Sequence, residues 1–172
     1  HLGGNDFVHD TVLPAIIKRK NHFLYRKYAP VLLDACAETA RRCRAIVFVN
    51  ALKKTPTGLR NTTFAYDRTG TLVDTYDKEH LVRSEHTVSG LDGSYMWEWT
   101  RPKIMVIDGV RFAFMTCYDF YFYENYANIA RMKPDVIIGC SHQRSDRHDA
   151  LEMFGRFLAY NTCAYVVRAS VS

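Results

Sequence analysis

Long apolar runs are missing from this chain. None approaches the roughly 18 to 20 consecutive apolar residues of a membrane-spanning helix. The first residues also lack the basic, apolar and small-residue order of a secretion signal. The chain has no internal repeat, low-complexity tract or linker. These absences indicate a single domain over residues 1–172 with no membrane contact, and we expect it to be cytoplasmic.

Cysteine spacings typical of a metal or disulfide site are also missing. The five cysteines are Cys36, Cys43, Cys117, Cys140 and Cys163. Their irregular distribution fits neither a disulfide framework nor a zinc site, so we interpret them as reduced thiols. A site built from Cys140, His142 and His148 would lack any recognised ligand spacing, and we expect no bound metal.

Long runs of basic residues are missing, although the net charge is +5. Lysines and arginines are scattered among acids, with short runs such as those at residues 18–20 and 41–42. Such short runs are usually solvated helix faces, so we expect no nucleic-acid partner. The chain does contain 48% hydrophobic residues, which is enough for one core.

Helical spacing of apolar residues recurs in three places. It predicts helices over residues 31–43, with Pro30 suited to the first turn, over about 122–129, and over about 147–160. Residues 1–28 have weaker periodicity and are predicted to be partly helical.

Extended, β-rich stretches lie between these helices. They predict strands at residues 45–51, 61–66, 71–76, 103–107, 111–115, 135–139 and 164–171. Turn sequences at residues 67–70 and 108–109 predict two hairpins. Hairpins combined with crossover helices predict an α/β fold, in which a mixed β-sheet is covered by helices.

Cys117 lies where a predicted buried strand ends and a predicted helix begins. The unpaired N–H groups and dipole of a helix N-terminus favour a thiolate and can stabilise an oxyanion. Sites in open α/β sheets also gather beyond the carboxyl ends of strands. The alternative is that Cys117 is a small, buried core residue.

Two motifs around this cysteine resemble the nitrilase-like carbon-nitrogen hydrolases. That family has an apolar strand followed by Cys-Tyr-Asp and a glutamate five residues after the aspartate. The matching residues are Cys117, Tyr118, Asp119 and Glu124. Upstream, residues 58–70 and 76–81 resemble the family's hairpin and its Tyr-x-Lys-x-His-Leu segment, with Lys78 on the catalytic lysine. The resemblance covers roughly residues 30–172.

This resemblance implies the four-layer α-β-β-α sandwich of the family and a chemical role for several residues. Cys117 would attack the substrate, while Lys78 and the N–H of Tyr118 would hold the oxyanion. Glu85 would be the second glutamate that positions the lysine and the general base. The loop after Gly139 would line the substrate pocket with Ser141, His142, Gln143 and Arg144. The resemblance implies no metal and no organic cofactor.

The family also commonly forms homo-oligomers through helices near the nucleophile. The aromatic residues Tyr121, Tyr123 and Tyr126 could serve such an interface, or they could belong to the core. Tyr121 and Tyr123 stand where the family pattern has arginine and proline, so substrate preference does not transfer from the motif.

The family's catalytic base has no good candidate in this sequence. The only glutamate before Lys78 is Glu38, inside the predicted helix 31–43, where it would not come within reach of the reacting proton. We therefore expect the base upstream of His1 and further strands after Ser172, and we expect the isolated 172-residue chain to be inactive. The chain would be either a central fragment of an enzyme or a natural remnant that lost catalysis.

The sequence as a whole predicts a hydrolase of non-peptide carbon-nitrogen bonds, in amides, carbamoyl amides or nitriles, acting through a cysteine thioester. Its partner would be a small-molecule amide or nitrile substrate. The alternatives are a noncatalytic interaction domain of the same fold, or an acyltransferase that uses the same thioester.

Overall fold

The computed structural model describes residues 13–96, 103–141 and 147–170. Its helices are α2 (Leu13–Cys43), α3 (Arg83–Thr87), the 3₁₀ turn η2 (Cys117–Tyr121), α4 (Tyr123–Met132) and α5 (His148–Thr162). Its strands are β1 (Val47–Lys54), β2 (Leu59–Tyr66), β3 (Leu72–Asp77), β4 (Met105–Ile107), β5 (Val110–Thr116), β6 (Val136–Ser141) and β7 (Tyr165–Ser170).

The strands form two sheets. One is the antiparallel meander β1-β2-β3, and the other has the order β4-β5-β6-β7. In the second sheet β4 and β5 form an antiparallel hairpin, while β5, β6 and β7 run parallel through the crossover helices α4 and α5. Both hairpins predicted from the turn sequences are therefore present.

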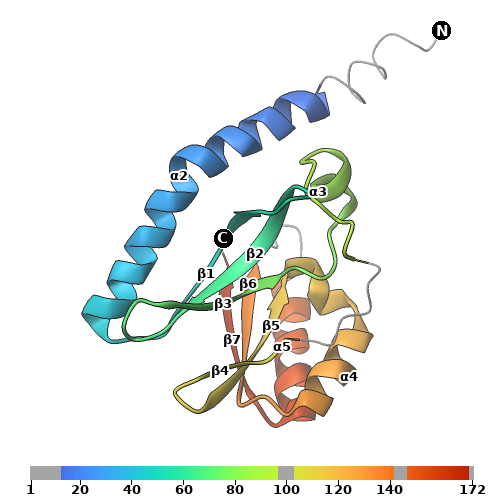
Figure 1. Ribbon diagram of the computed structural model, residues 1–172. Coiled ribbons are helices and arrows are strands. Elements are labelled where there is room, and N and C mark those ends of the chain that lie inside the picture. The colour runs from blue at the N-terminus through green and yellow to red at the C-terminus, as the bar shows by residue number, and fades with distance from the viewer. Residues whose placement is uncertain (1–12, 97–102, 142–146, 171–172) are drawn as a thin grey trace, which may run out of the picture.

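Three apolar clusters hold four layers together. Ala65 and Tyr76 of the first sheet pack against Phe112, Phe114 and Ile138 of the second. The opposite face of the second sheet is covered by α4 and α5, and the outer face of the first sheet by the C-terminal half of α2 (Figure 1). The expected α/β class, with sheets covered by helices, is confirmed in an α-β-β-α order.

Helix α2 is much longer than the sequence indicated. It begins at Leu13 and continues through Pro30, which the sequence placed in a first turn. Tertiary contacts explain the difference. Tyr25 packs against the cluster around Leu59, and the Asn21 side chain donates a hydrogen bond of 3.1 Å to the Ser89 carbonyl. These contacts favour helix on the N-terminal side of the proline, where periodicity alone was weak. Among the helices described, none combines the length and apolar character needed to cross a bilayer.

Candidate active site

Cys117 occupies a sharp backbone turn at the end of β5. Its φ is +50°, a left-handed conformation that costs a non-glycine residue free energy, of order 1–3 kcal/mol. The expected α-helix does not follow directly, because η2 comes first and α4 begins only at Tyr123. The short turn brings Cys117 off the strand and into a cavity, and strained positions of this kind cluster at functional sites.

This cavity lies between the two sheets and has a volume of about 590 Å³. Lys78 and Glu85, from the segment after β3, line it together with Cys117, which follows β5. Phe48 contributes an apolar wall, and Cys140 places a second thiol in the same cavity. The structure thus brings together the three side chains that the sequence analysis selected as catalytic.

Lys78 is almost completely buried, with 1% of its surface exposed. Its Nζ lies 2.5 Å from Oε2 of Glu85. The same carboxylate accepts a hydrogen bond of 2.9 Å from the Asn61 side chain and one of 2.9 Å from the Val82 N–H. A buried ammonium group needs such a paired, hydrogen-bonded partner. Glu85 therefore holds the lysine at the cavity wall.

Asp119 joins the segment of Lys78 to the turn at Cys117, a role the motif did not reveal. Its side chain is fully buried. It accepts hydrogen bonds of 2.8 Å from the Thr116 N–H, 2.9 Å from the Tyr76 hydroxyl and 2.8 Å from the His80 N–H. Nδ1 of His80 is a further neighbour at 3.2 Å. Burial and the Asp119 charge raise the pKa of Tyr76 well above its usual value, so its hydroxyl stays a donor.

The other predicted site residues are the oxyanion donor Tyr118 and the loop after Gly139. Tyr118 follows Cys117 in η2, where its N–H belongs to the N-terminal amides of the turn, and its oxyanion role stays a prediction. Ser141 ends β6, and His142, Gln143 and Arg144 lie outside the described residues.

Residues outside the cavity also have clear positions. Glu38 lies on α2 and pairs with Arg41. Tyr126 belongs to the core, where its hydroxyl donates a hydrogen bond of 2.7 Å to the Phe120 carbonyl. Tyr121 and Tyr123 are exposed. An oligomer interface at these two tyrosines stays a prediction.

Glu79 follows Lys78 and lies near the buried Asp119. Burial, and then the charge of Asp119, raise the pKa of Glu79 from 4.5 to about 7, while His80 acts in the opposite direction. The folded protein therefore binds this proton more tightly than the unfolded chain. Ionisation of Glu79 lowers the free energy of unfolding as pH rises from about 4.5 to about 7.

Glu79→Gln is expected to remove this penalty. At about pH 8 the variant should be more stable than the parent protein by about 1–3 kcal/mol, while near pH 4 the two should be about equal. Urea unfolding of the complete protein at both pH values measures the difference. Equal stability of parent and variant at pH 8 would show that ionisation of Glu79 does not lower the free energy of unfolding.

The chain thus combines a four-layer sandwich with a buried lysine and with a cysteine on a left-handed turn. The sequence profile of the carbon-nitrogen hydrolase family matches residues 12–171. The chain belongs to the carbon-nitrogen hydrolase family. No curated protein matches it.

Several solved structures share this fold. One is a mutant of the amidase from Nesterenkonia sp., with covalent addition of the acetamide moiety of fluoroacetamide at its active site cysteine; the TM-score is 0.73 at 13% identity, over 90% of this chain and 57% of that chain. Another is Nit3 of Saccharomyces cerevisiae, of branch 10 of the nitrilase superfamily, with a TM-score of 0.66 at 20% identity, over 81% of this chain and 50% of that chain. A carbon-nitrogen hydrolase from Helicobacter pylori has a TM-score of 0.67 at 11% identity, over 86% of this chain and 53% of that chain. The chain thus spans between half and three fifths of the length of these structures.

Proposed function

We propose that this chain provides the nucleophile and oxyanion side of an amidase-type hydrolase, in which Cys117 forms a thioester with the acyl part of a small amide or nitrile. The observation that carries the proposal is the shared cavity of Cys117 and Lys78, with Lys78 held by Glu85. The similar Nesterenkonia amidase, with its covalently modified active site cysteine, supports the same chemistry.

The proposed reaction has two steps. The Cys117 sulfur attacks the substrate carbon, and the Lys78 ammonium group with the Tyr118 N–H donates hydrogen bonds to the developing oxyanion. For an amide substrate, a general base takes the thiol proton and passes it to the nitrogen, the carbon-nitrogen bond breaks, and ammonia or an amine leaves. Water then attacks the thioester, releases the acid and restores the thiol.

Both steps need a general base for the thiol and then for water. Among the described residues that line the cavity, Glu85 is the only carboxylate. It already accepts hydrogen bonds from Lys78, Asn61 and Val82. We therefore assign Glu85 a positioning role and propose that the base is a glutamate that the described residues do not include.

Amide hydrolysis by the complete protein tests this proposal directly. We expect ammonia release from short-chain amides, and its loss to background when Cys117 is replaced by alanine. Cys140→Ala is the matched control, because it removes the other thiol of the same cavity and should retain activity. Activity that survives Cys117→Ala would contradict the proposal.

Labelling of the thiol separates the proposed enzyme from a noncatalytic domain of the same fold. Burial raises the pKa of Cys140 and Cys36, so both should react slowly with acrylamide at neutral pH. In the proposed enzyme, the mass-spectrometric adduct on Cys117 forms first. A Cys117 no more reactive than Cys36, together with no ammonia release, would favour the noncatalytic domain. Transfer of the acyl group to an added amine in preference to water would identify an acyltransferase.

A further inference from the structure

The segment from Val82 to Met96 contacts both the side-chain nitrogen and the backbone carbonyl of Lys78. Glu85 of this segment binds the side-chain Nζ, and Tyr95 donates a hydrogen bond of 2.6 Å from its hydroxyl to the Lys78 carbonyl. On the other side of the residue, the Lys78 N–H donates a hydrogen bond of 2.8 Å to the Asn61 carbonyl. Hydrogen bonds with Asn61 and Tyr95 therefore fix the backbone of Lys78, and Glu85 fixes its ammonium group.

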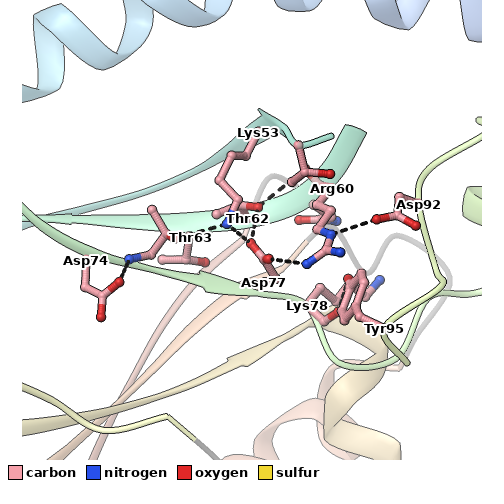
Figure 2. Close-up of polar contacts among 12 residues, drawn as sticks. Lys53, Arg60, Thr62, Thr63, Asp74, Asp77, Lys78, Asp92 and Tyr95 are labelled. Atoms are coloured by element: carbon pink, nitrogen blue, oxygen red, sulfur yellow. Dashed lines mark hydrogen bonds and ion pairs between the residues drawn. The ribbon is translucent and has the colours of Figure 1, made fainter. Parts of the chain in front are cut away.

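Tyr95 is itself fixed by Arg60 of β2. The guanidinium carbon of Arg60 lies 4.1 Å from the centroid of the Tyr95 ring, a cation-π contact. Figure 2 shows the Tyr95 ring beside both Arg60 and Lys78. Burial, and then the charge of Asp77, raise the pKa of Tyr95, so its phenol remains a hydrogen-bond donor across the pH range of an enzyme assay.

Arg60 in turn is held between two carboxylates. Its Nε lies 2.8 Å from Oδ2 of Asp92, in the same segment as Tyr95, and its Nη1 lies 3.1 Å from Oδ2 of Asp77, the residue before Lys78 (Figure 2). Asp77 also pairs with Lys53 at 2.5 Å. Two cations and two anions thus form a charge-balanced network, and at most 26% of any of these side chains is exposed. Such a network orients side chains better than an isolated surface pair.

We propose that Tyr95, oriented by Arg60, is a positioning residue for Lys78 in the reaction. Its hydroxyl fixes the Lys78 peptide, and this sets where the ammonium group meets the oxyanion. The inference rests on the proposed function for its catalytic consequence. Its structural part, control of the Lys78 backbone by the Tyr95 hydroxyl, stands without it.

Tyr95→Phe removes only the hydroxyl and keeps the ring against Arg60. In the complete protein, we expect kcat for amide hydrolysis to fall about tenfold to a hundredfold while KM changes less than about threefold. Alkylation of Cys117 by iodoacetamide, which forms no oxyanion, should keep its rate. A merely structural role would lower both rates together or neither. An unchanged kcat, or equal losses in both reactions, would overturn the proposal.

Hydrogen exchange tests the same inference without using activity. In Tyr95→Phe, we expect the Lys78 N–H to exchange about fivefold faster or more, while the Phe114 N–H in the centre of β5 keeps its rate. Arg60→Met, which leaves the hydroxyl but removes its orienting contact, should raise Lys78 exchange in the same direction. An unchanged Lys78 rate in Tyr95→Phe would overturn the inference, whether or not the protein hydrolyses amides. If exchange changes as expected but the parent protein hydrolyses no amide, only the proposed function fails.

Discussion

Replacing Lys78 with methionine is expected to lower kcat about a thousandfold, because one donor to the oxyanion disappears. Methionine suits the position, since the side chain is 1% exposed and a long apolar chain can fill the same space. Glu85 keeps its hydrogen bonds from Asn61 and Val82, so the cavity wall should hold its shape. The measurement is kcat at saturating amide, compared with the rate of Cys117 alkylation by iodoacetamide.

Lys103→Met provides the matched control. Lys103 also pairs with a carboxylate, Asp74, at 2.6 Å, but it does not line the cavity of Cys117. We expect this variant to lose less than about tenfold in kcat. If Lys78→Met retained more than a tenth of the parent kcat, the lysine would not be the oxyanion donor.

Asp119→Ala is expected to cost about 3–5 kcal/mol of unfolding free energy, the largest stability change proposed for this chain. The substitution leaves the N–H groups of Thr116 and His80 and the hydroxyl of Tyr76 buried without their acceptor. It also separates the two segments that carry Cys117 and Lys78. Urea unfolding of the complete protein measures the loss, and amide hydrolysis at a temperature where the variant stays folded measures the catalytic part.

Two milder substitutions give smaller losses of unfolding free energy with which the loss in Asp119→Ala can be compared. Tyr76→Phe removes one of the donors to Asp119 and should cost about 1 kcal/mol. Asp119→Asn keeps the shape but turns an amide nitrogen toward groups that also donate, so its cost should fall between the two. An alanine variant as stable as the phenylalanine variant would show that Asp119 does not join the two segments.

The sequence was informative where chemistry and motif spacing coincide. Cys117, Lys78 and Glu85 could be selected from the ordered motifs, and the structure places all three at one cavity. The strands were located within a few residues, because β-rich runs and turn residues are local signals. The role of Asp119 was not predictable, since its partners lie up to 43 residues away and only the folded chain brings them together.

Other features depend on tertiary contacts that a linear pattern does not contain. Tyr95 carries no motif, and its importance follows only from the Lys78 carbonyl and the Arg60 guanidinium beside it. Helix α2 continues through Pro30 because packing outweighs the local cost of proline. The η2 turn between Cys117 and α4 replaces the direct strand-to-helix junction that the apolar pattern favoured.

The arrangement of the two sheets has a consequence for the order of folding. Each sheet is built from its own continuous stretch of chain, β1 to β3 and then β4 to β7. The hairpins of the first sheet close across short loops, whereas the parallel strands of the second sheet pair only across the crossover helices α4 and α5, so each sheet can form from its own stretch of chain before the two sheets dock. Lys78 follows the first sheet and Cys117 follows a strand of the second, so the two meet only when the sheets dock. A chain whose sheets have formed but not yet docked therefore carries a thiol without its lysine, and we expect its chemistry to begin only with the last step of assembly.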